Sequence, residues 1–243
     1  MKGKFPKLKN VEKNLPPHCL NEFSNDFAFK IGKQITYLLA TKSTPSVEGP
    51  EWESIFANAI GAQWLPSNVG LDDVVLKNCA WGAKSVKHVS PWTVEQIRLI
   101  CGRNSPIYSF GSTLDKNSPP QNLGDEILSI WNARVDQIRC KYEHARTVVL
   151  IKSSDLLKLT IFELELHRFD PLQVEWTWNK RGNLEGKLKG FHKFTWQPHG
   201  SQFTIKEDVP AKKLCLQLKF PPKINEEHIL SSIGFNKTWI EII

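Results

Sequence analysis

Residues 70–76 read Gly-Leu-Asp-Asp-Val-Val-Leu, and residues 79–87 read Cys-Ala-Trp-Gly-Ala-Lys-Ser-Val-Lys. The first run is short and apolar and has an acidic pair, Asp72 and Asp73, at its start. The second run carries two lysines, Lys84 and Lys87. Short apolar runs with polar punctuation are typical of β-strands. The pattern therefore predicts a strand that begins beside two carboxylates, followed by a strand that carries two cations.

A helix is predicted about twenty residues upstream, where residues 49–56 read Gly-Pro-Glu-Trp-Glu-Ser-Ile-Phe. Its apolar positions, including Trp52, Ile55 and Phe56, form one face, and Glu53 lies near the boundary of that face. A helix glutamate, a strand-edge aspartate and a lysine on the next strand form the arrangement that a magnesium-dependent phosphodiesterase needs. Carboxylate oxygens hold the hard cation, and the lysine faces the scissile phosphate or the attacking water.

With these motifs the chain resembles the PD-(D/E)XK nuclease superfamily and, within it, the type II restriction endonucleases. The resemblance implies a Mg²⁺ cofactor and cleavage of double-stranded DNA, and it implies a homodimer because such enzymes cut both strands of a symmetric site. It also implies roles for six residues: a metal ligand at Asp73 or alternatively Asp72, a second carboxylate at Glu53, a carbonyl ligand at Ala83, and a water-positioning lysine at Lys84 or alternatively Lys87.

The chain departs from the family pattern at one position. The family normally places Glu or Asp two residues before the lysine, whereas here Gly82 precedes Lys84 and Ser85 precedes Lys87 at that spacing. Either Glu53 or Glu51 supplies the missing oxygen from the helix, or the site is inactive or altered. A plainer interpretation is that the two aspartates mark a turn and the two lysines are solvated at a sheet edge.

The composition is that of an intracellular globular protein with a moderate basic surplus. The 243 residues suffice for one α/β or α+β domain, and 32 Lys and Arg against 25 Asp and Glu give a net charge of +7. A cationic surplus favours a polyanionic partner, although many basic proteins bind no nucleic acid. Five scattered cysteines without metal-ligand spacing favour free thiols in a reducing cytoplasm. No signal peptide or membrane helix is predicted.

The order of predicted elements indicates a mixed central β-sheet flanked by helices, with a β-rich C-terminal part, which is an α/β (α+β) fold of the restriction-endonuclease type. Helices are predicted over residues 21–41, from 49, from about 90 to 102, and over 123–144. Strands are predicted over residues 146–152, 157–166, 174–178, 191–196, 202–205 and 214–220. We expect a single nuclease domain with an N-terminal arm at 1–20, a catalytic core at 21–170 and a DNA-recognition part at 171–243.

Two polar segments of the C-terminal third are candidates for reading DNA bases. They contain the Arg, Lys, Asn and Gln side chains that contact base edges and phosphates, and the loop after residue 103 offers two more. The candidate DNA-binding residues are Arg103, Asn104, Asn179, Lys180, Arg181, Asn183, Lys193, Gln197, His199, Ser201 and Gln202. Trp178 and Trp196 either stack on bases or buttress these loops. Polar loops of this kind are also the ordinary chemistry of turns.

The sequence leaves three functions open. The first is a magnesium-dependent, sequence-specific endonuclease of double-stranded DNA, which is a type II site-specific deoxyribonuclease. The second is a DNA-binding protein of the same fold that does not cleave DNA, as Gly82 in place of the family's acidic residue suggests. The third is a repair nuclease that nicks one strand. His192 and His199 match no metal-ligand pattern, because no third partner stands at a fitting spacing.

Overall fold

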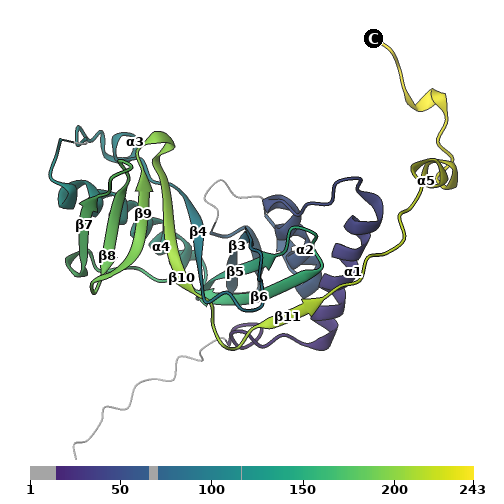
Figure 1. Ribbon diagram of the computed structural model, residues 1–243, viewed down its shortest axis with the longest axis horizontal. Helices are drawn as coiled ribbons and strands as arrows, with labels where there is room; N and C mark the ends of the chain where they lie inside the picture. Colours follow the sequence, from purple (N-terminus) through teal and green to yellow (C-terminus); the bar gives the residue numbers. More distant parts are fainter. Residues whose placement is uncertain (1–14, 66–70, 116) are drawn as a thin grey trace, which may run out of the picture.

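The protein is described here from a computed structural model, which places residues 15–65, 71–115 and 117–243. Its fold is mixed α+β, as predicted, and consists of two β-sheets with helices packed on them (Figure 1). Part of the predicted arm, residues 1–14, and Gly70 lie outside the described residues.

The first sheet has six strands in the order β1-β2-β3-β5-β6-β11. These strands span Gln63–Trp64, Val74–Leu76, Cys79–Lys87, His144–Lys152, Lys158–Glu165 and Leu214–Gln217. β3 and β5 run parallel, and the other neighbours run antiparallel. Parallel strands need a long crossover connection, and here the crossover runs through β4, α3 and α4 before the chain returns to β5.

Two helices cover one face of this sheet. α1 (Asn25–Thr41) begins at Ser24, whose side chain accepts a hydrogen bond from the Phe27 N–H, and α2 (Gly49–Ile60) begins with a capping box between Glu48 and Glu51. Their apolar stripes pack on outward side chains of β3, β5 and β6 in one core cluster. Both predicted helices are confirmed: α1 begins four residues later than predicted and ends at the predicted residue 41, and α2 begins at the predicted residue 49.

The second sheet has five antiparallel strands in the order β4-β10-β9-β8-β7. They span Gln96–Arg103, Gln202–Asp208, Phe191–Gln197, Leu184–Leu188 and Val174–Trp178. The long helix α4 (Pro120–Lys141) lies between the two sheets: its buried side chains share one core cluster with β5 and β6 and with all strands of the second sheet. The short α3 (Pro106–Phe110) precedes it, and α5 (Glu226–Ser232) stands away from the body near the C-terminus (Figure 1).

The predicted helix over residues 90–102 is wrong, because residues 96–103 form strand β4. Ile97, Leu99 and Cys101 are buried, and Gln96, Arg98 and Ile100 between them are exposed. This alternation has the period of two that a strand with one buried face requires. Ile97 and Ile100 therefore point to opposite faces rather than sharing one helix face.

The other predicted elements match observed ones with shifted ends. The helix expected at 123–144 spans 120–141, and the strand expected at 202–205 extends to 208. β8 was not predicted because its five residues, Leu-Glu-Gly-Lys-Leu, include a central glycine and two charges. The sheets also exchange strands across the expected boundary at residue 170, since β4 joins the second sheet and β11 joins the first.

Among the residues that the structure describes, no helix is both long and apolar enough to cross a bilayer.

Candidate functional site

The β2–β3 hairpin brings Asp73 against the middle of β3. Val74 pairs with Trp81, so Asp73, one residue before β2, lies beside the stretch that contains Ala83 and Lys84. The Asp73 carboxylate accepts a hydrogen bond from the Ala83 N–H at 3.0 Å, and the Lys84 Nζ lies 3.9 Å from the same oxygen. β3 is fixed between β2 and β5. The aspartate and the lysine that the sequence singled out are therefore neighbours on a rigid sheet.

Burial dominates the chemistry of Asp73, which is only 2% exposed. The pKa of its carboxyl is raised from 3.8 to about 6, chiefly because the group is removed from water and to a smaller extent because the carboxylates of Glu53 and Asp72 lie nearby. The Lys84 ammonium and the Ala83 N–H oppose this shift. A carboxyl group with a pKa raised by burial and by two other acids is typical of a site that accommodates a cation or a proton.

The two other predicted carboxylates are held by their own partners. Glu53 projects from α2 and accepts a hydrogen bond from the Trp64 Nε1 at 3.0 Å. Asp72 is half-buried, and its carboxylate lies 3.8 Å from the Lys141 Nζ at the end of α4. Both carboxylates are close enough to Asp73 to raise its pKa. The structure thus brings Glu53 of α2 and Asp72 near Asp73, whose carboxylate lies beside Lys84.

These acids suit magnesium in kind, although they form a sparse ligand set. Mg²⁺ in enzymes is often held by only one or two carboxylates, with waters and substrate phosphates completing the shell, and Asp73 with Glu53 would meet that minimum. Within the described ranges, no group of three or more His, Cys, Asp or Glu side chains is placed to hold a metal ion. In kind, the residues therefore fit a cation whose coordination shell water and a substrate phosphate would complete.

Lys87, the alternative lysine, lies three residues beyond Lys84 at the exposed end of β3. Because successive side chains alternate across a strand, the two lysines point to opposite faces of the sheet. Lys87 instead stands in register with Lys152 of β5. Of the two predicted lysines, Lys84 is the one that the structure places beside Asp73.

Lys84 also lines a cavity of about 280 Å³ at the junction of the two sheets. Its walls include Leu99 and Ile205 from the second sheet, Trp131 from α4 and Thr147 from β5. Lys193 lines the same cavity, where its Nζ pairs with the Glu207 carboxylate at 2.7 Å. Lys193 is a predicted DNA-binding residue, but on β9 its side chain faces this interior junction.

Most of the other predicted DNA-binding residues gather at one end of the second sheet. Gln202 of β10 pairs with Arg103 of β4 and with Gln197 of β9. The end of β4, the β9–β10 turn and the β7–β8 turn therefore lie at the same end of the sheet. The exposed side chains at this end are those of Arg103, Lys180, Arg181, Gln197 and His199. The half-buried Asn183, Ser201 and Gln202 lie in the same turns.

Asn104 and Asn179 have structural places instead. Asn104 is completely buried, donates its side-chain N–H to the Ile127 carbonyl at 2.9 Å and accepts a bond on its backbone carbonyl from the Trp196 Nε1. It therefore cannot contact DNA in this conformation, and Trp196 is a buttress rather than a stacking platform. Asn179 organises the β7–β8 turn: its side-chain oxygen accepts from the N–H groups of Arg181 and Asn183.

Sequence reasoning missed a buried polar network on the helix-covered face of the first sheet. Glu163 of β6 is 0% exposed, and its carboxylate accepts bonds from the Trp81 Nε1 at 2.6 Å and the Arg146 guanidinium at 3.2 Å. His18 contacts the same carboxylate at 2.9 Å, and Asn21 bonds to the Glu163 backbone. The one available signal was a charged residue inside the apolar run of β6. This network ties residues 18–21 to the sheet.

Comparisons with known proteins add no assignment: no family model, no curated protein and no solved structure matches this chain.

Proposed function

We propose that this protein is a magnesium-dependent endonuclease of double-stranded DNA, similar in chemistry to the type II restriction endonucleases. The observation that carries the proposal is the placement of a buried, acid-flanked Asp73 beside Lys84 at the middle of a central strand. The net charge of +7 is compatible with a polyanionic substrate.

Asp73 and Glu53 would hold the Mg²⁺, with the Ala83 carbonyl as a further oxygen ligand. When bound, the ion supplies a Lewis acid that polarises the phosphodiester and lowers the pKa of water. Asp73 is kept in position by the Ala83 N–H, and Glu53 by the Trp64 indole. Asp72, the alternative ligand, is instead paired with Lys141.

Lys84 would orient the attacking water and attract the phosphate. Its ammonium group carries three N–H donors, which suffice for a phosphate oxygen, the water and the Asp73 carboxylate at once. In the reaction a bond forms between the water oxygen and phosphorus, the bond from phosphorus to the 3′-oxygen breaks, and the product keeps a 5′-phosphate. Cutting both strands of a symmetric site would require a homodimer, in which each copy contributes one such site.

The cysteines are compatible with the reducing cytoplasm in which we place the enzyme. All five are free thiols, as is usual for cytoplasmic proteins.

The test is cleavage of unmethylated duplex DNA by Asp73→Ala and Lys84→Ala variants in magnesium. Both should abolish cleavage, and Asp73→Ala should leave specific binding intact or tighten it, because a carboxylate repels phosphate when no metal intervenes. Lys87→Ala is the matched control, since it removes a lysine from the same strand but from the opposite face. Unimpaired cutting by Asp73→Ala and Lys84→Ala would contradict the site assignment.

A second candidate is a DNA-binding protein that does not cleave. It is favoured by Gly82, which stands where the family pattern has a carboxylate, and by the lack of a three-ligand group among the described residues. Duplex binding without magnesium-dependent cleavage by the wild-type protein would select this candidate.

A further inference from the structure

Among the described residues, no helix packs on one of the two faces of the second sheet. Its inner side chains, such as Leu99, Phe194 and Ile205, pack with α4 in the core. The side chains that alternate with them point to the opposite face, which we call the outer face. In the described part of the chain, no helix shares a core cluster with outer-face residues. An antiparallel sheet tolerates such a solvated face, so its side chains are free to meet a partner.

Two cations lie directly opposite each other on this outer face. Arg98 of β4 and Lys206 of β10 are a register pair, and like charges in directly opposite positions destabilise a sheet. Neither makes an ion pair within the described residues. Asp208, on the same outer face, accepts a bond from the neutral Gln96 side chain, and Glu207 pairs with Lys193 on the inner side. Two adjacent cations thus stand without an ion-pair partner among the described residues.

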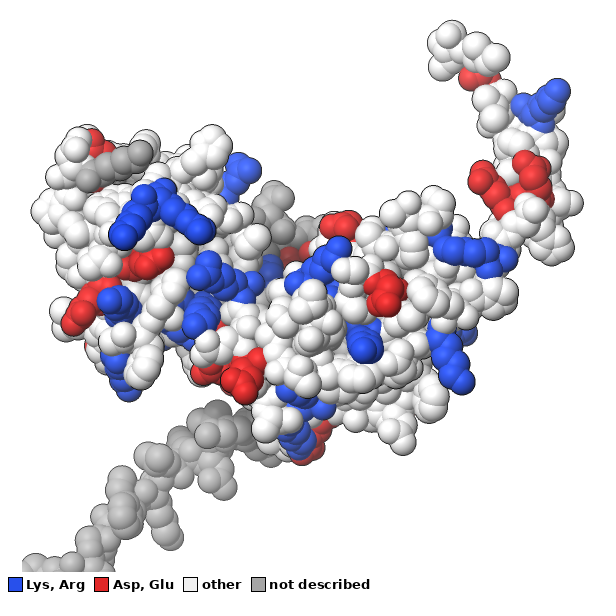
Figure 2. Space-filling model, viewed as in Figure 1, with Lys and Arg blue, Asp and Glu red and all other residues white. Residues whose placement is uncertain are grey.

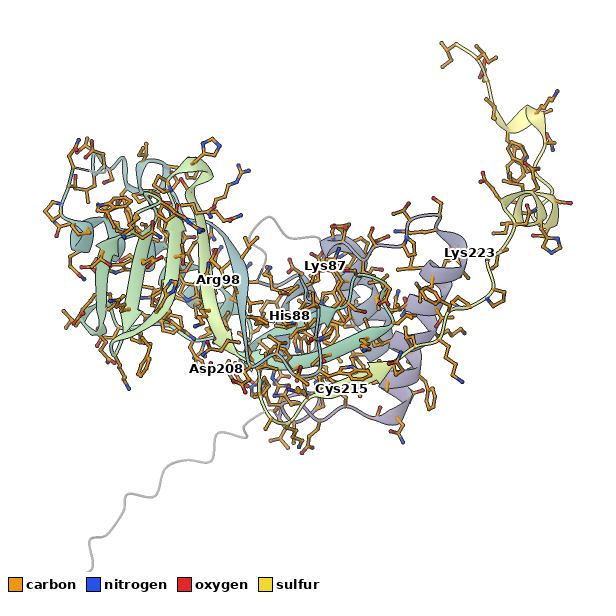
Figure 3. All side chains as sticks on the ribbon, viewed as in Figure 1. Lys87, His88, Arg98, Asp208, Cys215 and Lys223 are labelled. Carbon is orange, nitrogen blue, oxygen red and sulfur yellow. The ribbon has the colours of Figure 1, made fainter. Side chains whose placement is uncertain are left out.

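The rest of the outer face carries charges of both signs. Lys187 of β8 points outward and is exposed, but Glu175 stands opposite it in register and Glu185 lies on the same face of β8. Strand spacing of about 4.8 Å puts β8 about 14 Å from β4 across the sheet. Figure 2 shows basic side chains on this face where β4 and β10 lie, and Figure 3 labels Arg98 there.

We propose that the outer face, through Arg98 and Lys206, docks the phosphate backbone of double-stranded DNA. The choice of DNA rests on the proposed function, and the choice of an anion rests on the paired cations Arg98 and Lys206 of the adjacent strands β4 and β10. Proteins that hold single strands stack the bases on aromatic side chains, and the outward positions of β4, β8 and β10 carry no Phe, Tyr or Trp. A duplex presents phosphates to a surface without requiring such stacking.

The test is the salt dependence of binding to a fluorescently labelled duplex in EDTA, measured by anisotropy. The Arg98→Gln/Lys206→Gln double variant should bind more weakly. Its plot of log affinity against log salt should be shallower by about 1.8, which is about 0.9 for each lost phosphate contact. Lys33→Gln/Lys219→Gln is the matched control: it removes the same charge from exposed positions outside the second sheet and should keep the wild-type slope. An unchanged slope, or an equal change in the control, would overturn the proposal.

A second variant separates docking from folding. Lys206→Glu places an acid opposite Arg98, so its melting temperature should equal or exceed that of the wild type while duplex binding weakens. A variant with wild-type duplex affinity would contradict the proposal, and so would a slope change seen only with single-stranded DNA. Because these measurements need no cleavage, the docking face can stand if the nuclease proposal fails. A protein that cleaves normally when Arg98 and Lys206 are changed would refute only the docking face.

Discussion

At the scale of single residues, the chemistry of the candidate site depends on the burial of Asp73. Its pKa in the folded protein, about 6, exceeds the ordinary value of 3.8. The folded state therefore holds the proton more tightly than the unfolded state does. The contribution of Asp73 to stability is most favourable below about pH 4 and is lost as the pH rises through about 6. At neutral pH, without metal, this carboxylate destabilises the fold.

Asp73→Asn should therefore stabilise the metal-free protein. The expected gain in unfolding free energy is about 1 to 3 kcal/mol at pH 7, since each pKa unit corresponds to about 1.4 kcal/mol, and the gain should vanish towards pH 4. Urea unfolding at both pH values measures it. Magnesium should stabilise the wild type but not the variant. A variant less stable than the wild type at pH 7 would show that the charged carboxylate is already compensated.

Glu163 is a second residue whose role follows from its burial in the fold and not from its position in the sequence. Arg146 is only 2% exposed. Glu163→Gln would leave its guanidinium without its buried counter-charge. Loss of one partner of a buried pair is strongly destabilising, and we expect Glu163→Gln to lower the unfolding free energy by about 3 kcal/mol. Glu165→Gln is the control, because Glu165 also pairs with Arg146 at 3.4 Å but is 37% exposed. It should lower stability by less than about 1 kcal/mol. Equal losses in chemical denaturation would refute a special role for the buried network.

The sequence could predict the neighbours Asp73 and Lys84 because both belong to one hairpin. Asp73 and Lys84 are eleven residues apart, so the local pairing of β2 with β3 is enough to bring them together. The sequence could not predict the polar network of Glu163 with Trp81, Arg146 and His18. These side chains come from three strands and a segment distant in the sequence. Asn104 was misread for the same reason: whether a polar loop residue is exposed depends on α4 and β9, which pack over it.

At the scale of elements, α4 and the second sheet meet at Trp176. An added methyl group on Gly124 of α4 would come within 2.2 Å of the Trp176 ring, and one on Gly186 of β8 within 2.8 Å. Trp176 thus fills the space that two glycines leave open on opposite sides. A glycine inside a helix normally destabilises it, and here the close approach of helix and sheet explains the residue.

Gly124→Ala should consequently destabilise the protein, by about 1 to 3 kcal/mol through overpacking, although alanine is the better helix former. Gly32→Ala in α1 is the matched control. Its added methyl group would meet the Leu218 side chain at an ordinary 3.5 Å, so it should stabilise by up to about 1 kcal/mol. Thermal unfolding of both variants checks the opposite signs. A stabilising Gly124→Ala would mean that α4 does not pack on Trp176 as described.

Element types were predictable where periodicity was unambiguous, as in α1 and β5. The element type was not predictable at β4. There Ile97 and Ile100 have the three-residue spacing of a helix, whereas Ile97, Leu99 and Cys101 have the two-residue spacing of a strand. Pairing with β10, about a hundred residues later, decides between the two. The sequence pattern within β4 does not indicate which distant strand will pair with it.

At the scale of the whole molecule, the two sheets are joined by α4 and by strands that cross the boundary at residue 170 between the predicted core and the predicted C-terminal part. β4 comes from the N-terminal half of the chain and completes the second sheet, and β11 returns to close the first. The candidate site on β2 and β3 and the cavity at the sheet junction therefore share Lys84. The exposed turns predicted to read DNA lie at the end of the second sheet that carries Arg103, whereas Glu207 and Asp208, which line the cavity, lie at the other end of β10.

The proposed functions of cleavage, backbone docking and base reading fall on separate regions of the molecule, and cleavage is the central one. The most direct test incubates the purified wild-type protein with unmethylated phage DNA, with magnesium or with EDTA, and resolves the products by electrophoresis. The proposed nuclease function predicts discrete fragments that require magnesium. Intact DNA in magnesium, from folded protein that binds duplex, would contradict the nuclease and leave a DNA-binding protein.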